Sequence, residues 1–367
     1  MQRRTFHDKL GIVGCGLWKP VIGSLAGAFL LLAAISCSST QGAPEDTGAG
    51  SQINGAGATF PYPIYSKWFD EYNKLHPDVR VNYQSQGSGA GIRQLTNETV
   101  FFGASDGPMT DDQLKAAPGK ILHFPTVLGA DVPVYNIPDL RGRLKFSGPL
   151  LADIFLGKIT RWNDPAIARL NPDAALPAMD ITVVHRSDAS GTTYIWVDFL
   201  SKASSEWKSR VGTATAVNWP IGIGGKGNEG VAGLVTLTPG SIGYVELIYA
   251  LQNKMTYGAV QNAAGSFVEA SVQSVTAAAA SMAGEMPDDF RISITNAPGP
   301  DAYPISSFTW LLLYENPKNK EQSRVMVDFL KWALTDGQGF AGQMGYAPLP
   351  SELVRLELAA LEGVKTS

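Results

Sequence analysis

The sequence predicts an α/β protein, and two observations support this. Of its 367 residues, 44% are hydrophobic and 17% charged, which is enough apolar material for about two domains with their own cores. Short β-branched or alternating apolar runs also alternate along the chain with amphipathic helical patterns. The strand-like runs are 80–83, 121–128, 181–184 and 308–314, and the helical patterns are 64–75, 167–170, 194–202 and 321–334.

Residues 1–37 have the features of an export signal and are set aside from the fold. Basic residues precede an apolar run, 21–35, that is shorter than the ~20 residues a membrane-spanning helix needs. The run ends in Ala34-Ile35-Ser36-Cys37, which resembles the lipobox of bacterial lipoproteins, so lipid attachment is expected at Cys37. Ordinary signal cleavage and a retained membrane helix are the alternatives. Residues 3–6 (RRTF) resemble a twin-arginine signal, which leaves the export route open.

The segment after this signal predicts a flexible linker. Residues 38–51 (SSTQGAPEDTGAGS) are small, polar and rich in glycine, so they cannot form a core. The two cysteines, Cys15 and Cys37, lie in or at the end of the signal, and the mature chain therefore offers no internal disulfide. No metal site is expected, because the histidines show no ligand spacing; they are His7, His76, His123 and His185.

The charge balance argues against nucleic acid as a partner. The whole chain has a formal net charge of −4, and removing the basic leader makes the remainder more negative. General nucleic-acid binding depends on clustered lysine and arginine. An anionic ligand would therefore have to be bound by local geometry.

Three glycine- and hydroxyl-rich segments each lead into an amphipathic helical pattern. A helix N-terminus offers unpaired backbone N–H groups and the positive end of the helix dipole, so three such junctions together favour an oxyanion site. For each junction alone, a simple helix N-cap is the alternative. The segments are 55–61 (GAGATFP), 85–91 (SQGSGAG) and 190–193 (SGTT).

Two further side chains fit an oxyanion site. The planar fork of Arg186 matches two oxygens of a phosphate or sulfate, and Asp188 is placed to hold the guanidinium, although a surface salt bridge would also explain this pair. Asp106 lies among apolar and small residues in 101–109 (FFGASDGPM), where a turn or cap role is the alternative. An ionised carboxylate only accepts hydrogen bonds, so it attracts a protonated oxyanion and repels a fully deprotonated one.

Nine ordered blocks carry a family resemblance over nearly the whole mature chain. The sequence resembles the phosphate-binding protein of the bacterial high-affinity phosphate ABC transporter. The blocks are GAGATFPYPIYSKW (55–68), NYQSQGSGAGIRQL (82–95), FGASDGPM (102–109), FPTVLGADVPVYNIP (124–138), LADIFLGKITRWNDPAIARLNP (151–172), VVHRSDASGTT (183–193), NWPIGIGGKGNEGVAG (218–233), GSIGYVEL (240–247) and YPISSFTW (303–310).

The resemblance implies a ligand set for inorganic phosphate. Asp106 would accept the hydrogen bond from the protonated phosphate oxygen, Phe60 would use its backbone N–H, and Asp188 would support Arg186. The implied phosphate-binding residues are Thr59, Phe60, Ser88, Asp106, Arg186, Ser190, Gly191 and Thr192. No cofactor is implied.

The same resemblance implies a two-lobed periplasmic-binding-protein fold of type II. Each lobe would be a mixed sheet flanked by helices, with the ligand in the cleft between them. Residues 51–128 and 303–360 would form lobe I, and 129–302 lobe II. The implied role is a monomeric, exported, lipid-anchored binding protein of the periplasm or cell surface. Its partners would be permease subunits working with a cytoplasmic ATPase.

Two other functions are open to the sequence. A serine hydrolase or phosphatase using Ser190 would need a base, but His185 is on an expected strand and no G-x-S-x-G elbow occurs. A binding protein for sulfate, molybdate or tungstate would place an anion without protons against the Asp106 carboxylate. Both are less favourable than phosphate binding.

Overall fold

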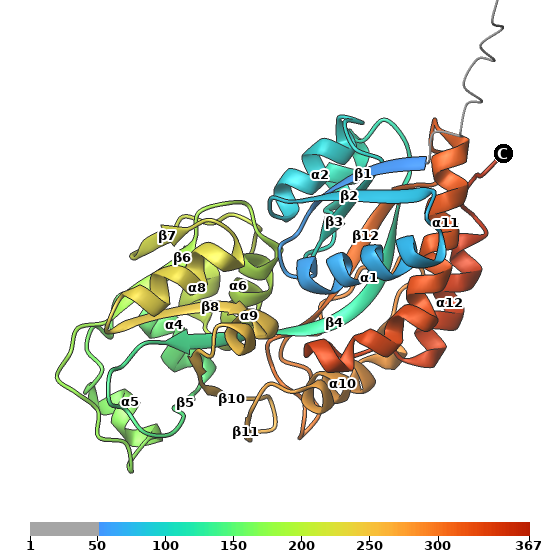
Figure 1. Ribbon diagram of the computed structural model, residues 1–367. Helices are drawn as coiled ribbons and strands as arrows, with labels where there is room; N and C mark the ends of the chain where they lie inside the picture. The colour runs from blue at the N-terminus through green and yellow to red at the C-terminus, as the bar shows by residue number, and fades with distance from the viewer. Residues whose placement is uncertain (1–50) are drawn as a thin grey trace, which may run out of the picture. The chain divides into compact units, whose positions relative to one another are not determined.

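The computed structural model describes residues 51–367, and the predicted signal, lipobox and Cys37 lie outside the described residues. A nine-stranded mixed sheet runs through this part of the chain in the order β2-β1-β3-β12-β4-β8-β6-β7, with β9 (Thr256–Tyr257) paired to β4 (Figure 1). A separate three-stranded sheet joins β5 (Lys145–Phe146), β10 (Ala259–Gln261) and β11 (Phe267–Val268). Within residues 51–367, no helix combines the length and apolar character needed to cross a membrane.

The first half of the sheet consists of β2, β1, β3, β12 and the first part of β4, and it contains both parallel and antiparallel strand pairs. Strands β1, β2 and β3 are parallel, whereas β12 is antiparallel to β3 and β4. Helix α1 buries residues spaced by three or four positions, as predicted, and its Phe69 contacts Phe329 of α11. The elements are β1 (Ser51–Gly57), α1 (Tyr62–Leu75), β2 (Val79–Ser85), α2 (Ser88–Thr96), β3 (Phe102–Ser105), α3 (Asp111–Ala116), β4 (Ile121–Tyr135), β12 (Ser306–Tyr314), α11 (Lys320–Leu334) and α12 (Ser351–Leu361).

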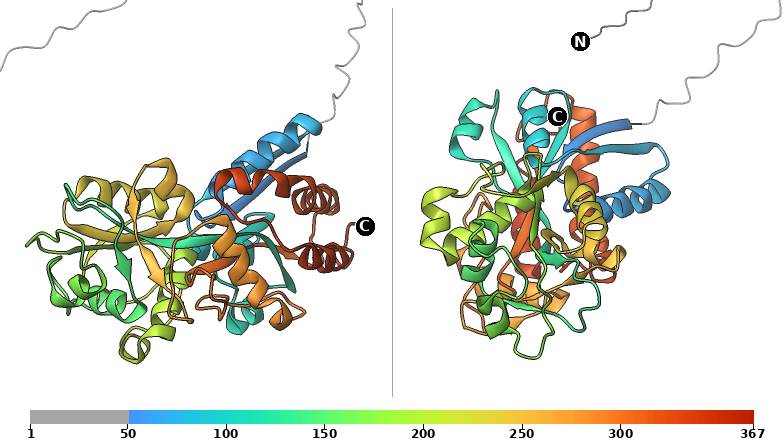
Figure 2. Two further views of the ribbon diagram at one scale, coloured as in Figure 1. Left: turned by 90° about the horizontal axis from the view of Figure 1, so that it is seen from below. Right: turned by 90° about the vertical axis from the view of Figure 1, so that its left-hand side faces the viewer.

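The second half of the sheet contains β8, β6 and β7, which are joined to the first half through β4. Helix α6 packs on α4 and β8, and α8 packs on β6 and β8. Figure 2 shows the same elements gathered around this end of the sheet. They are α4 (Gly148–Phe155), α5 (Pro165–Leu170), β6 (Thr182–Arg186), α6 (Gly191–Ala203), α7 (Ser205–Arg210), β7 (Ile223–Gly225), α8 (Gly227–Leu237), β8 (Ser241–Glu246) and α9 (Leu247–Gln252).

All eight predicted segments lie on helices or strands of the expected type, except that Ile181 comes one residue before β6. The prediction of an α/β protein is therefore confirmed. Segment 121–128 proved to be only the first part of β4, which continues to Tyr135. This strand pairs with β12 through residues 121–130 and with β8 through residues 131–135, so one long strand belongs to both halves of the sheet.

Residues 272–302 contact strands of the first half of the sheet and also α6, a helix that packs on the second half. Helix α10 (Val272–Ser281) packs on β4 and β12. Beyond it, Trp310 of β12 donates from Nε1 to the Phe290 carbonyl oxygen at 2.8 Å, whereas Lys202 of α6 donates to Thr295 Oγ1 at 2.8 Å. The predicted lobe division places the whole segment in lobe II, and that division stays a prediction.

Asp131 lies at the point where β4 passes from β12 to β8. Its backbone N–H donates to the Ile305 carbonyl oxygen at 2.9 Å, and its own carbonyl oxygen accepts from the Tyr303 hydroxyl at 2.9 Å. The side chain is fully buried opposite Glu246, and neither carboxyl oxygen has a hydrogen-bond partner. Burial raises the pKa of Asp131 well above its usual value, and the charges of Asp106 and Glu246 raise it further.

We expect Asp131→Val to stabilise the protein by about 1–3 kcal/mol, because it removes two buried acceptors that lack donors. The pKa of Asp131 is raised in the folded protein, so the free energy of unfolding of the native protein falls as pH rises above the ordinary carboxyl range. The gain from valine should therefore be larger at pH 8 than at pH 5. Thermal unfolding at both pH values measures this difference, and a lower melting temperature for the variant at pH 8 would contradict it.

Candidate functional site

The segment from Arg186 to Thr192 spans the end of β6, the turn at 187–190 and the start of α6. Ser190 caps α6, since its Oγ accepts from the Thr193 N–H at 3.1 Å. The Arg186 guanidinium is buried and donates to both carboxylate oxygens of Asp188, from Nε at 2.8 Å and from Nη2 at 2.5 Å. Asp188 thus holds Arg186, as predicted, through a bidentate ion pair, and this pair is not an exposed surface salt bridge.

A second helix entrance faces this turn. The Gly191 N–H donates to Ser88 Oγ at 2.9 Å, and the Gly89 N–H donates to the Ala189 carbonyl oxygen at 2.9 Å. Ser88 is the first residue of α2, so these bonds join the N-termini of α2 and α6. Ser88 and Gly191 are both buried. Two positive helix ends therefore point into one enclosed region.

Asp106 is the carboxylate beside these two helix ends, directly after β3. Its Oδ1 accepts from Thr309 Oγ1 at 2.8 Å, and its Oδ2 lies 3.4 Å from Ser88 Oγ. Burial raises the pKa of Asp106 to about 7, although the Thr309 hydrogen bond, the Arg186 charge and the Ser88 hydrogen bond oppose this rise. The carboxyl group can thus change its charge near neutral pH.

Thr59 and Phe60 follow β1 and complete the site from another side. Thr59 Oγ1 accepts from Asn228 Nδ2 at 2.8 Å, and the Thr59 carbonyl oxygen accepts from the Tyr249 hydroxyl at 2.6 Å. The Phe60 carbonyl oxygen accepts from the Tyr346 hydroxyl at 2.6 Å. These tyrosines hold the backbone of the β1–α1 turn in place.

The structure brings all the predicted ligand residues into one buried region: Gly191 is buried, and each of the other seven is at most 3% exposed. Sequence reasoning did not single out Asn228 or Thr309, which bond directly to predicted site residues. Both lie inside blocks that carry the family resemblance, 218–233 and 303–310. Nothing in their local pattern distinguishes them from ordinary helix and strand residues.

The serine-hydrolase alternative gains no support from this geometry. His185 Nδ1 lies 3.0 Å from the Arg186 carbonyl oxygen, and its ring stacks on Trp219 with centroids 4.7 Å apart. Across residues 51–367, no hydrogen bond joins Ser190 to a histidine, and no group of three or more histidine, cysteine or acidic residues is arranged to hold a metal ion.

We expect Gly191→Ala to weaken ligand binding at least about tenfold by keeping the two helix ends apart. A Cβ atom at this position would lie 2.5 Å from Ser88 Oγ and 2.6 Å from Asp106 Oδ2, closer than real Cβ contacts. Gly233→Ala is the matched control, because a Cβ there meets nothing within 4 Å. Titration calorimetry of both variants measures the effect, and equal affinities would contradict this placement of Gly191.

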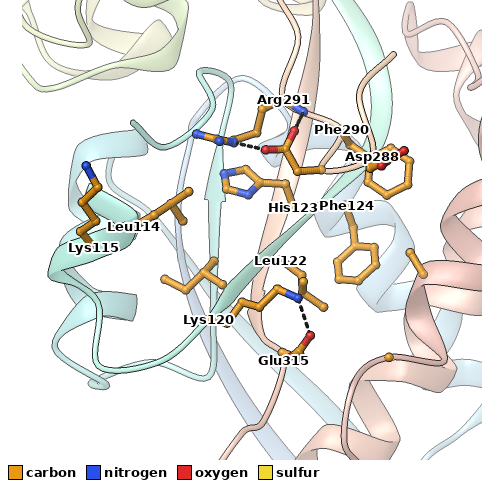
Figure 3. Close-up of a pocket in the computed structure, with 14 residues that line it drawn as sticks. Leu114, Lys115, Lys120, Leu122, His123, Phe124, Asp288, Phe290, Arg291 and Glu315 are labelled. Atoms are coloured by element: carbon orange, nitrogen blue, oxygen red, sulfur yellow. Dashed lines mark hydrogen bonds and ion pairs between the residues drawn. The ribbon is translucent and has the colours of Figure 1, made fainter. Parts of the chain in front are cut away.

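A cavity of about 550 Å³ lies elsewhere, between α3, β4 and the segment around Arg291 (Figure 3). Four of its charged groups form two pairs: Lys120 Nζ lies 2.6 Å from Glu315 Oε1, and Arg291 Nε donates to Asp289 Oδ2 at 2.7 Å. The predicted ligand residues do not line this cavity. It is therefore separate from the candidate site.

Comparison with known proteins agrees with this geometry. Residues 42–337 match the family model described as a PBP superfamily domain. The chain is 49% identical over 306 residues to the phosphate-binding protein PstS of Xylella fastidiosa strain Temecula1, covering 83% of each chain. It is 48% identical over 304 residues to PstS of Pasteurella multocida, covering 83% of this chain and 88% of that protein.

A solved structure shares the fold. The phosphate-binding protein of Stenotrophomonas maltophilia matches with a TM-score of 0.63 at 18% identity, covering 84% of this chain and 93% of that chain. This likeness shows the mixed α/β fold of phosphate-binding proteins. The family model and the sequence relatives establish that the chain belongs to the PBP superfamily and, within it, to the PstS family of phosphate-binding proteins.

Proposed function

We propose that this protein binds inorganic phosphate outside the cytoplasm and delivers it to the permease of an ABC transporter. One observation carries this proposal: the N-termini of α2 and α6 and the buried Arg186, which is held by Asp188, all lie near the buried carboxylate of Asp106. Helix ends and a guanidinium attract an oxyanion, whereas a carboxylate requires the anion to carry a proton. Phosphate near neutral pH meets both conditions.

The proposed ligand set is the one that the family resemblance implies, with Asp188 in support. Arg186 would supply charge and paired donors, and Asp106 would accept from the protonated oxygen. The remaining donors would be backbone N–H groups and hydroxyls, from Thr59, Phe60, Ser88, Ser190, Gly191 and Thr192. Ser88 and Gly191, which now bond each other, would then each bond a phosphate oxygen.

The proposed binding mode involves both predicted lobes. Lobe I, residues 51–128 and 303–360, would contribute Asp106, and lobe II, residues 129–302, would contribute Arg186. A ligand held from both sides stabilises the closed arrangement over an open one. We further propose a non-enzymatic, monomeric role, export of the chain, and lipid anchoring through Cys37 at the periplasmic or cell surface.

A competition titration tests the proposed function. Protein lacking residues 1–37 is titrated with phosphate, arsenate and sulfate, and binding is followed by tryptophan fluorescence or heat. Phosphate is expected to bind far more tightly than sulfate at pH 8. Tighter binding of sulfate than of phosphate would overturn the proposal.

A further inference from the structure

Asn228 connects site residues that come from distant parts of the chain. It is the second residue of α8 and is fully buried. Its Nδ2 donates to Thr59 Oγ1 at 2.8 Å and to Thr192 Oγ1 at 3.1 Å. One amide group thus uses its two protons on two hydroxyls, one after β1 and one in the first turn of α6.

The orientation of this amide is fixed by the protein. Asn228 Oδ1 accepts from the backbone N–H of Glu246 at 2.9 Å. A backbone N–H can only donate, so the amide oxygen must face Glu246 and the NH₂ group must face the threonines.

The threonine hydroxyls have their acceptor positions filled. Thr59 Oγ1 accepts from Asn228 Nδ2 and also from the Asn228 backbone N–H at 3.3 Å. Thr192 Oγ1 accepts from Asn228 Nδ2 and from Arg186 Nη1 at 3.1 Å. A hydroxyl has two lone pairs and one proton, so each threonine hydroxyl can form a further hydrogen bond only as a donor. Within residues 51–367, neither hydroxyl donates to a protein acceptor.

We propose that Asn228 is a positioning residue that makes Thr59 and Thr192 obligatory hydrogen-bond donors toward a single oxyanion. The proposal rests on the proposed phosphate site and adds the residue that sets the polarity of its two threonines. A ligand oxygen that only accepts is favoured at this side of the site, whereas Asp106 requires a donor at the other. Asn228 also connects two parts of the site through its hydrogen bonds, Thr59 after β1 and Thr192 in α6.

Asn228→Asp tests the polarity directly, because it changes the amide to a group of the same shape that only accepts. The threonine hydroxyls would then donate to the introduced carboxylate instead of to phosphate. Phosphate affinity at pH 8 is expected to fall at least about thirtyfold. Asn171→Asp is the control, since Asn171 is also buried and bonded to backbone groups, but lies beside β5 rather than in the site. Its phosphate affinity is expected to change less than about threefold.

A pH profile separates positioning from mere structural support. Protonation of the introduced carboxyl restores one donor, so the affinity ratio of N228D to the native protein should rise as pH falls from 8 to 5. A flat ratio, or an N228D affinity within about threefold of native at pH 8, would overturn the inference. Failure of the native protein to bind phosphate would instead overturn the proposed function.

A double-mutant cycle gives a second test that does not depend on N228D folding. Asn228→Ala and Thr192→Val are measured singly and together by phosphate titration. Coupled residues show a combined loss clearly smaller than the product of the single losses. Losses that multiply would show that Asn228 does not act through Thr192 and would overturn the inference.

Discussion

Asp106→Asn is expected to raise sulfate affinity about a hundredfold while lowering phosphate affinity less. In the proposed site of the native protein at pH 8, the ionised Asp106 carboxylate would face the ligand, and sulfate has no proton to offer it. Asparagine can rotate its amide to donate to sulfate or to accept from phosphate. The measurement is the ratio of phosphate to sulfate affinities by calorimetry in the native and variant proteins.

The selectivity of the native protein should also depend on pH. Burial raises the pKa of Asp106 to about 7, so below that pH the carboxyl group carries a proton and can donate. Sulfate binding by the native protein should therefore strengthen as pH falls from 8 to 5, relative to its binding by the Asn variant, whose side chain does not titrate. Unchanged selectivity in Asp106→Asn at pH 8 would remove Asp106 from the ligand set.

Thr309 explains why the Asp106 carboxylate retains a charged form despite its burial. Its hydroxyl donates to Oδ1 at 2.8 Å and opposes the rise in the pKa of Asp106. The hydroxyl is held in turn, because the Thr309 carbonyl oxygen accepts from Thr126 Oγ1 at 3.1 Å and Thr126 Oγ1 lies 2.8 Å from the Tyr65 hydroxyl. The support of the Asp106 carboxylate thus comes from two strands, β12 and β4, and from helix α1.

The fold could be predicted where local pattern decides the structure. Amphipathic spacing predicts α1 and α11, and alternating or β-branched runs predict β2 and β6. Strand β4 was predicted only to 128, because its continuation contains Gly129, Asp131 and Pro133, which disfavour a strand. Its pairing with β12 and then β8 overrides that local preference.

The candidate site could be predicted where the residues that interact lie close together in the sequence. Arg186, Asp188 and Ser190 stand together in the sequence, and their ion pair and cap follow from that spacing. Asn228 and Thr309 act over distances of 36 and 203 residues along the chain, on Thr192 and Asp106 respectively. Such pairs depend on tertiary contacts, which one sequence does not reveal. The pairing of buried Asp131 in β4 with buried Glu246 in β8 likewise depends on tertiary structure.

Arg186→Ala is expected to weaken phosphate binding about a thousandfold, which corresponds to ~4 kcal/mol for loss of one partner of a buried charge pair. Sulfate affinity should fall by a similar factor, because the guanidinium neutralises any oxyanion and does not sense its protons. The phosphate-to-sulfate ratio should therefore stay near the native value, in contrast to Asp106→Asn. Titrations at pH 9 are required, since removing the Arg186 charge raises the pKa of Asp106 further.

Part of that loss comes from the partner left behind. Without Arg186, the Asp188 carboxylate is a partly buried anion beside the proposed site, with a remaining hydrogen bond from the Gly227 N–H at 3.0 Å. The double variant Arg186→Ala/Asp188→Asn removes that charge, so it should bind phosphate more tightly than Arg186→Ala alone, yet more weakly than the native protein. If the double variant bound no better than the single one, repulsion by Asp188 would contribute nothing. If Arg186→Ala retained native affinity for both anions, the guanidinium would have no part in the site.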